Sequence, residues 1–349
     1  MPEFAAVVTG RAVATPFGCS VAGNCDALCA GRTAFAPPGH FDSKGRLLGV
    51  DPELDGGFGS RAERLLDKLR SAVDFPIPPR TRLFLGTTVG AIDLLERGRE
   101  IDTAAALLDV AERRFGLPDG VLVSAACASG QSAAGMAMRQ LAAGVCDHAL
   151  VVGADITSEF VTAGFAALGA VSPTVCRPYD AARDGLTLGE SAAAILLSRA
   201  GEGVGRILAV AENCDAAHIT APDLDGRQLQ QVIRQAAKER PVGGVVGHGT
   251  GTVYNDQAEA AALYATLPDV PLFSLKGNFG HTLGATGVLQ LALGLEFARR
   301  RRLPPQAGLS SPMPHAAVSA TMRNLAAPTI VSLNVGFGGL NSAVMLEAL

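Results

Sequence analysis

Short apolar runs alternate with longer alanine-rich stretches along the chain, and this alternation constrains the fold more than any other feature. Most of the runs are too continuously apolar to alternate in polarity, so they predict strands that are buried on both faces. The predicted strands are Ala5–Val8, Leu83–Leu85, Val121–Ala125, His148–Val152, Ala193–Leu197, Ile207–Ala211, Gly244–Val246, Ile330–Asn334 and Ala343–Glu347. The predicted helices are Val21–Ala30, Ile101–Arg114, Ser129–Ala143, Gly226–Glu239, Asp256–Leu267 and Ala285–Arg300. Strands that alternate with helices predict an α/β protein.

The chain also shows a coarse internal duplication. Each half contains a strand that leads into a helix of small residues, at Val121–Ala143 and at Ser274–Arg300. The glycine-rich segment Gly201–Arg206 predicts the boundary, so we expect two similar halves, 1–204 and 205–349.

Composition excludes several classes of protein. Hydrophobic residues make up 48% of the 349 residues and charged residues 18%, which excludes intrinsic disorder and allows a sizeable core. The net charge of −4 argues against nucleic acid as a partner. Every apolar stretch is broken before about 18 residues, so no membrane span is expected.

An odd number of cysteines, seven, without a secretory signal indicates reduced thiols and a cytoplasmic location. The polar segments 37–60 and 71–81 are expected to be surface connections.

The segment VLVSAACASGQSAAG, residues 121–135, holds the first candidate site residue. A predicted strand ends at Ala125 and a helix begins near Ser129, so Cys127 lies on a strand-to-helix elbow that faces the helix N-terminus. The partial positive charge there is expected to lower the pKa of the thiol. A lowered pKa would make Cys127 a nucleophile. The alternative interpretation is a structural cysteine in a tightly packed turn.

The second candidate site residue, His248, lies in the segment VVGHGTGTVYND, residues 245–256. His248 follows a predicted strand and has glycines on both sides, which leave its ring open to a cleft. A hydrogen-bonded core histidine is the alternative. A glycine-rich turn before a helix can also bind phosphate. However, neither GxxxxGK[ST] nor GxGxxG in a βαβ context accompanies it, so nucleotide binding is not expected.

Two further segments carry candidate residues. SLKGNFGHTLGATG, residues 274–287, places Lys276 and His281 in a loop before a helix of small residues. LNVGFGGLNSAVML, residues 333–346, contains a buried strand that breaks at GFGG. Glycine within a strand marks a bend or a close backbone approach. Phe337, one aromatic ring among these glycines, is a candidate for a movable gate, with ordinary core packing as the alternative.

Together these motifs resemble one family closely. ACASG, HGTGTVYND, KGNFGHTLGATG and GFGG, in this order, are similar to the β-ketoacyl-acyl carrier protein synthases of the elongating type, which carry a Cys-His-His triad on the thiolase fold. The resemblance includes RPYDAARDGLTLGESAAAILL (177–197) and CDAAHITAPDLDG (214–226), and it covers nearly the whole chain. It implies a thiolase-like fold, with two similar halves in a five-layer αβαβα sandwich.

The resemblance implies a decarboxylative Claisen condensation. Cys127 would hold an acyl group, and malonyl-acyl carrier protein would extend it in the synthesis of a fatty acid, polyketide or polyene. His248 and His281 would bind the malonyl thioester carbonyl and promote decarboxylation, because N–H donors aimed at a developing enolate lower the barrier. Lys276 would be their electrostatic partner. No metal or cofactor is implied.

The same resemblance assigns supporting residues and partners. Asp256 and Glu259 would support the site, and Phe337 with Gly338 would form the acyl-pocket gate and part of an oxyanion hole. The implied partners are acyl carrier protein and a second subunit, in a homodimer or in a heterodimer with a ketosynthase-like chain. The predicted edge strand at this interface is Val121–Ala125.

The sequence departs from the family in two places. The chain is shorter than usual members between about residues 37 and 120. Gln290 stands where the family usually has a glutamate paired with the lysine, so Lys276 would depend on Glu259 alone. Two other functions stay open: a non-catalytic chain-length-type partner subunit, and thiolase-like acyl exchange on coenzyme A.

The remaining cysteines and histidines show no ligand spacing, and no zinc site is expected. His218 is expected to be structural, and the residues expected to be small core cysteines are Cys19, Cys25, Cys29, Cys146, Cys176 and Cys214.

Overall fold

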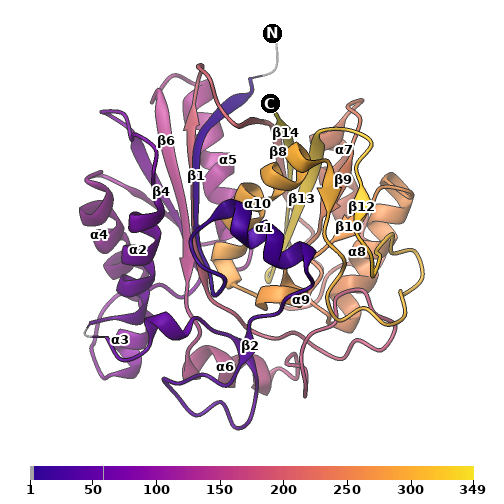
Figure 1. Cartoon of the computed structure of the whole chain (residues 1–349), viewed down its shortest axis with the longest axis horizontal. Coiled ribbons are helices and arrows are strands. Elements are labelled where there is room, and N and C mark those ends of the chain that lie inside the picture. Colours follow the sequence, from indigo (N-terminus) through magenta and orange to yellow (C-terminus); the bar gives the residue numbers. More distant parts are fainter. Residues whose placement is uncertain (1–3, 58) are drawn as a thin grey trace.

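The structure is a computed structural model that describes residues 4–57 and 59–349. Within these residues, ten strands form one sheet in the order β10-β9-β13-β14-β8-β1-β7-β6-β4-β5 (Figure 1). Their bounds are β1 (Ala6–Ala14), β4 (Arg82–Gly86), β5 (Val121–Val123), β6 (His148–Asp155), β7 (Ser191–Ser198), β8 (Gly205–Cys214), β9 (Gly244–Val246), β10 (Leu272–Phe273), β13 (Thr329–Gly336) and β14 (Leu340–Ala348). Short pairs outside this sheet are β2 (Phe35–Ala36) with β3 (Leu48–Gly49), and β11 (Arg302–Leu303) with β12 (Arg323–Asn324).

The large sheet consists of two sets of five strands with the same internal order. The first set runs β5-β4-β6-β7-β1 and the second β10-β9-β13-β14-β8. In each set the first three strands are parallel and the remaining pairs are antiparallel. The sets meet where β1 pairs with β8 over only three positions. The strand order therefore repeats, whereas the boundary between 1–204 and 205–349 stays a prediction.

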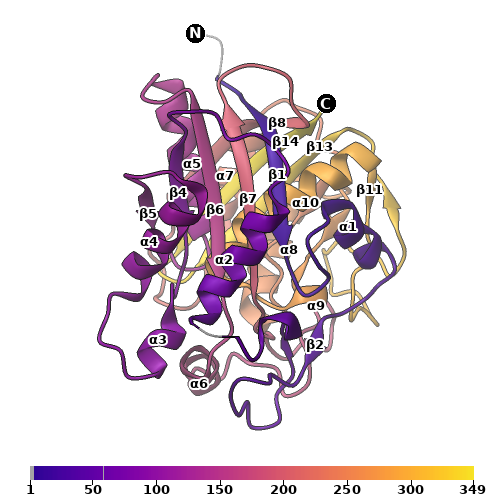
Figure 2. The ribbon, with the colours of Figure 1, turned by 60° about the vertical axis from the view of Figure 1, so that its left-hand side comes forward.

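Helices form three layers around these two sets of strands. The helices are α1 (Val21–Cys29), α2 (Arg61–Ala72), α3 (Ile92–Glu96), α4 (Thr103–Phe115), α5 (Ser129–Ala142), α6 (Glu159–Ala167), α7 (Arg227–Ala237), α8 (Val253–Thr266), α9 (Lys276–Phe279) and α10 (Thr286–Arg300), with short 3-10 turns η1 (Pro52–Leu54) and η2 (Leu283–Ala285). α2 and α4 pack outside the first set, and α7 packs outside the second with α8 against it (Figures 1 and 2). α5 and α10 contact strands of both sets. The layers are α, β, α, β and α, as predicted.

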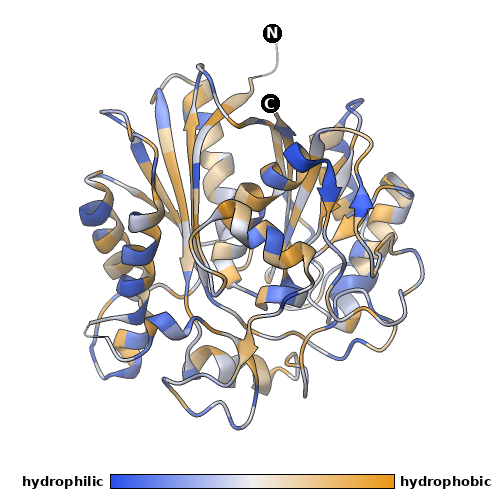
Figure 3. Ribbon diagram, in the orientation of Figure 1, coloured by the Kyte–Doolittle hydropathy of each residue, from blue (hydrophilic) through white to orange (hydrophobic). Residues whose placement is uncertain are grey.

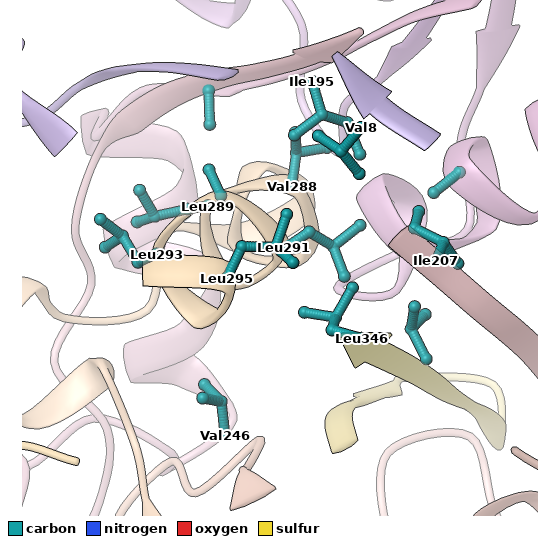
Figure 4. Close-up of a cluster of buried hydrophobic side chains, with 14 of the residues drawn as sticks. Val8, Ile195, Ile207, Val246, Val288, Leu289, Leu291, Leu293, Leu295 and Leu346 are labelled. Carbon is teal, nitrogen blue, oxygen red and sulfur yellow. The ribbon is translucent and has the colours of Figure 1, made fainter. Parts of the chain in front are cut away.

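The core lies around α10, which is buried on all sides from Thr286 to Ala298 and is mostly apolar, as expected for a central helix. Figure 4 shows Val288, Leu289, Leu291 and Leu295 of α10 among side chains of the surrounding strands. Figure 3 shows that hydrophobic residues predominate on the central strands, while hydrophilic ones gather on the outer helices and loops. α5 approaches α10 closely, as shown by Gly130, where a Cβ would lie 2.8 Å from the amide nitrogen of Val288 in α10.

The sequence patterns miss one long helix, and one prediction about the fold is wrong. The helix α2 was not predicted, although Ser60 accepts from the amide of Ala62 as an N-cap and caps of this type start helices. The segment 37–60, of which residue 58 lies outside the described part, is not only a surface connection. Leu48 is buried in a core cluster, and Gly49 donates to the carbonyl of Leu188. The polar composition of the segment does not indicate these contacts, because their partners are distant in the sequence.

Most predicted boundaries shift by one to three residues, and β1 extends to Ala14 because it pairs with β7 from Val7 to Ala14. Among the described helices, none is both long and apolar enough to cross a bilayer.

Candidate active site

The structure brings the predicted nucleophile and both predicted histidines to one cavity. Cys127, His248 and His281 line a cavity of about 400 Å³ together with Phe337. The three residues come from the ends of β5 and β9 and from the loop between α9 and α10. Most of the other wall is apolar and includes Phe165, Leu168, Leu186, Ile219, Val253 and Val335. Such a cavity fits an apolar chain whose reactive end meets a few polar groups.

Cys127 lies on the predicted elbow. Ala126 has a φ of +48°, a left-handed conformation that turns the chain sharply between β5 and α5. The Ser129 hydroxyl fixes the turn, because it accepts from the amide of Ala125 at 2.9 Å and donates to the carbonyl of Ala126 at 2.6 Å. The Cys127 side chain is buried, and the residue is only 5% exposed.

The predicted lowering of the Cys127 pKa is wrong. Burial raises the pKa of the thiol to about 11, although the charge of Lys276 lowers it. The Asp155 carboxyl raises it further, and the backbone amides of Phe337 and Cys127 lower it. The desolvation cost of a buried thiolate exceeds the stabilisation by Lys276 and the two amides. The same two amides would stabilise negative charge on the sulfur.

His281 is a neutral N–H donor. Its Nδ1 accepts from the backbone amide of Leu283 at 3.2 Å and lies 3.3 Å from the hydroxyl of Thr286. Burial and the charge of Lys276 hold the pKa of the imidazole well below its usual range. Because a backbone N–H can only donate, Nδ1 is the acceptor and the ring proton lies on Nε2.

His248 has the same tautomer for a different reason. Its Nδ1 lies 3.3 Å from the ammonium of Lys276, which has no acceptor when charged. Burial, followed by the charges of Lys276 and His281, lowers the pKa of His248 well below its usual range. The two rings meet edge to face with their centroids 5.3 Å apart. Two neutral imidazoles therefore each present an Nε2–H group.

Lys276 is buried and its ammonium also donates to the carbonyl oxygen of His248. Burial lowers the pKa of Lys276 to about 8, against the charge of Glu259. Among the described residues, no carboxylate oxygen lies within ion-pair distance of this ammonium, so Glu259 acts on it through space. The thiol of Cys176 donates to the Lys276 carbonyl at 3.0 Å.

Asp256 and Glu259 lie on α8 and hold the turn after β9. Glu259 accepts from the amides of His248 at 2.6 Å and of Gly249 at 2.8 Å. Asp256 accepts from the amides of Thr250 and Gly251. Burial raises the pKa of Asp256, and it raises that of Glu259 to about 7. Both carboxyls thus fix the backbone around His248.

Sequence reasoning missed Tyr179 and Asp155. The Tyr179 hydroxyl donates to Glu259 at 2.8 Å and lies 3.0 Å from the amide of Gly249. Asp155 accepts from the hydroxyl of Thr87 and is fully buried at the end of β6. Tyr179 has a φ of +60°, which no sequence pattern shows. Asp155 could have been found from the sequence, because it is an acidic residue at the end of an otherwise apolar strand.

The hydrogen bonds of Gln290 go to groups other than Lys276. The Gln290 amide nitrogen donates to the carbonyl of Gly247 at 2.8 Å, and its oxygen accepts from Asn334, Ser332 and Gln131. The residue that replaces the family glutamate therefore belongs to a neutral hydrogen-bonded group.

The GFGG segment breaks the strand as predicted. β13 ends at Gly336 and β14 begins at Leu340. Phe337 is half-buried, and its ring centroid lies 5.7 Å from that of Phe165. Gly338 is exposed with a φ of +88°, and its amide donates to the carbonyl of Ile219 at 2.7 Å. Phe337 and Ile219, which lies in the loop that follows β8, thus both line the cavity.

The cysteines outside the site differ from the prediction. Cys25 and Cys176 are buried, but Cys19, Cys29 and Cys146 are half-buried and Cys214 is exposed at the end of β8. Strand and helix ends expose side chains that the sequence pattern places inside. His218 is exposed at the cavity, where its Nδ1 accepts from the amides of Thr220 and Ala221. Among the described residues, no three His, Cys, Asp or Glu side chains gather in a way that could hold a metal ion.

Comparisons with known proteins agree with this geometry. The sequence models of the β-ketoacyl synthase N-terminal and C-terminal domains match residues 120–202 and 204–310. A putative polyketide β-ketoacyl synthase 1 from Streptomyces cyaneus is 31% identical over 97% of this chain and 97% of its own length. The granaticin polyketide putative β-ketoacyl synthase 1 from Streptomyces violaceoruber is 29% identical over 98% of this chain and 97% of its own.

Solved structures share the architecture. A β-ketoacyl synthase from Burkholderia phymatum superimposes with a TM-score of 0.83 and 26% identity over 99% of this chain and 100% of its own. A ketosynthase in complex with its chain length factor from Xenorhabdus doucetiae superimposes with a TM-score of 0.85 and 24% identity over 100% of this chain and 99% of that one. The fold is thiolase-like, as predicted.

Proposed function

This chain belongs to the β-ketoacyl synthase family, and from that premise we propose that it catalyses a decarboxylative Claisen condensation. In this proposal Cys127 holds an acyl group and malonyl-acyl carrier protein extends it, in the synthesis of a fatty acid, polyketide or polyene. The single observation that carries the proposal is the shared cavity of Cys127, His248 and His281, in which both imidazoles present N–H groups.

Acylation of Cys127 is the first step. The sulfur attacks the thioester carbonyl of acyl-carrier protein, and the carrier thiol leaves with the proton of the cysteine. Negative charge develops on the carbonyl oxygen of the tetrahedral intermediate. The amides of Phe337 and Cys127, which lower the pKa of the thiol, would stabilise such charge. Phe337 would gate the acyl pocket, and Gly338 would allow its movement.

Condensation is the second step. The bond between the malonyl carboxylate and its α-carbon breaks, CO₂ leaves, and the electron pair becomes an enolate. The Nε2–H groups of His248 and His281 would donate to the enolate oxygen. The α-carbon then attacks the acyl carbonyl, and the sulfur of Cys127 leaves. Lys276 would keep His248 in the donor tautomer, while Asp256 and Glu259 hold its backbone.

The test separates the two half-reactions. We expect mass spectrometry to find an acyl adduct on Cys127 after incubation with acyl-carrier protein, and none in Cys127→Ala. We expect Cys127→Gln to decarboxylate malonyl-carrier protein without acyl transfer, because an amide imitates the acylated state. An adduct on a different cysteine would contradict the assignment.

A non-catalytic chain-length-type subunit is the second candidate. It is favoured by the raised pKa of Cys127, because the thiolate is the nucleophilic form. The chain is also shorter than its relatives, since the alignments extend over 413 positions and the chain has 349 residues. This candidate predicts neither an adduct nor decarboxylation by the isolated protein. Thiolase-like exchange predicts an adduct from acyl-coenzyme A without malonyl decarboxylation.

We further propose that acyl carrier protein and a second subunit are the partners, in a homodimer or a heterodimer with a ketosynthase-like chain. β5 is the edge strand of the sheet directly before Cys127, and an unpaired edge invites pairing. On α6, and just after its end, Phe160 is 63% exposed and Leu168 is 58% exposed. Light scattering that shows a fully active monomer would contradict the dimer.

A further inference from the structure

Gln290 is a polar residue in the middle of a helix that is otherwise apolar there. Its neighbours Leu289 and Leu291 belong to the buried core around α10 (Figure 4). Gln290 itself is completely buried. Because a buried amide costs free energy unless it is hydrogen-bonded, its partners should explain why it is there.

The partners fix the orientation of the amide. Asn334 Nδ2, the Ser332 hydroxyl at 3.3 Å and Gln131 Nε2 at 3.5 Å all donate to Gln290 Oε1. Gln290 Nε2 donates to the carbonyl oxygen of Gly247 at 2.8 Å. A reversed amide would set its own N–H groups against two other amide donors and its oxygen against a carbonyl.

The four side chains form a group that we call the amide hub: Gln131, Gln290, Ser332 and Asn334. The hub connects segments that carry the candidate site. Gln131 lies one helical turn after Cys127 in α5, and β13 continues from the hub into the turn that holds Phe337. Gly247 immediately precedes His248.

The hub clamps one peptide group. The carbonyl of Gly247 and the amide of His248 belong to the same peptide unit. Gln290 donates to the carbonyl at 2.8 Å, and Glu259 accepts from the amide at 2.6 Å. The next carbonyl, that of His248, accepts from Lys276. The backbone at His248 is therefore held from three sides, and an ionised carboxylate at position 290 would lack the donor that the first contact needs.

The hub is not optimised for stability. Among the described residues, Gln131 Oε1 and Asn334 Oδ1 are buried without a hydrogen-bond partner. Unpaired buried acceptors destabilise the folded state, and an apolar side chain at position 290 would have needed no donors at all. Such a loss of stability is expected at a functional site, where the placement of a reacting side chain is more important than the stability of the fold.

We propose that Gln290 is a positioning residue for His248, acting through the peptide group between Gly247 and His248. The inference rests on the proposed function for the reaction that His248 serves. In this inference, the feature of residue 290 that positions His248 is the donor nitrogen of the amide, not a charge paired with Lys276.

The test compares Gln290→Met, which removes the polar ends, with Gln290→Glu, which keeps the shape and loses the donor when ionised. Gln140→Met, near the far end of α5, is the matched control. We expect malonyl decarboxylation to fall about three- to tenfold in Gln290→Met, as for one ordinary hydrogen bond. Gln290→Glu should show this loss only at pH values where its carboxyl is ionised, because a protonated carboxyl keeps an O–H donor. Acylation of Cys127 should stay within about twofold, because it does not use His248, and the control should match the parent. Equal loss of both reactions, or unchanged decarboxylation in Gln290→Met, would overturn the proposal.

A second measurement keeps the inference separate from the proposed function. If the parent protein neither decarboxylates nor forms an adduct, the proposed function fails, and the ring nitrogen signals of His248 decide about Gln290. In Gln290→Met we expect these NMR signals to shift away from the single Nε2–H tautomer, while those of His281 stay unchanged. Signals of His248 identical to those of the parent would refute the positioning role.

Discussion

The ammonium of Lys276 lies 3.3 Å from Nδ1 of His248 and also donates to the carbonyl oxygen of the same residue. A charged ammonium can only donate, so this contact sets the tautomer of the imidazole. The chemistry available at His248 therefore depends on the protonation of its neighbour. His281 does not share this dependence, because the backbone amide of Leu283 fixes its tautomer at any pH.

Malonyl decarboxylation should decrease as pH rises through about 8. Burial lowers the pKa of Lys276 to about 8, so the ammonium predominates below this pH and the neutral amine above it. The neutral amine has a lone pair that can accept a hydrogen bond from an Nδ1–H group, so the Nε2–H tautomer of His248 is then no longer enforced. The measurement is the rate against pH in the Cys127→Gln variant, which removes the titration of the thiol. A rate that stays flat from pH 7 to 9.5 would contradict this.

His248→Ala and His281→Ala should each slow decarboxylation about 10²–10³-fold, the usual effect of losing one donor to an oxyanion. Acylation of Cys127 should survive in part, because the amides of Phe337 and Cys127 remain. Single-turnover acylation and decarboxylation measured separately will show the difference. If both variants decarboxylate at the parent rate, the Cys-His-His mechanism is wrong for this protein.

Alkylation by iodoacetamide should distinguish two cysteines. Cys214 is exposed, whereas Cys127 is buried with a pKa of about 11. Near neutral pH we expect Cys214 to react first. The rate at Cys127 should rise about tenfold per pH unit up to about pH 10, because the thiolate is the reactive form. Peptide mapping by mass spectrometry gives both rates, with Cys214→Ser as the control. Faster labelling of Cys127 at neutral pH would show that its thiol is activated.

Gly130→Ala should destabilise the protein by about 1–3 kcal/mol, the range for overpacking a tight core. The new Cβ would lie 2.7 Å from the carbonyl oxygen of Gly284 and 2.8 Å from the amide nitrogen of Val288, both backbone atoms. The matched control is Gly164→Ala in the exposed helix α6, where a Cβ would meet nothing within 4 Å. That variant should be neutral or more stable by up to about 1 kcal/mol. Urea denaturation measures both, and equal effects would mean that α5 and α10 have room to separate.

Some of the site could be predicted from local sequence because its cause is local. A strand that ends in small residues before a helix places Cys127 on an elbow, and glycines around His248 keep its ring unobstructed. The alternation of apolar runs with alanine-rich stretches gave the α/β class for the same reason. By contrast, α2 was missed because its amphipathic pattern lies among polar segments.

Local sequence patterns were enough to predict most of the long strands and helices, the elbow that carries Cys127 and the family to which the motifs belong. Properties that depend on distant neighbours became apparent only in the folded chain. The pKa of Cys127 is raised because burial outweighs the charge of Lys276. Gln290 donates to the carbonyl of Gly247 rather than pairing with Lys276, because the fold brings α10 next to the end of β9. Desolvation and hydrogen bonding act between atoms that are close in space, and at these positions the partners lie far apart in the chain.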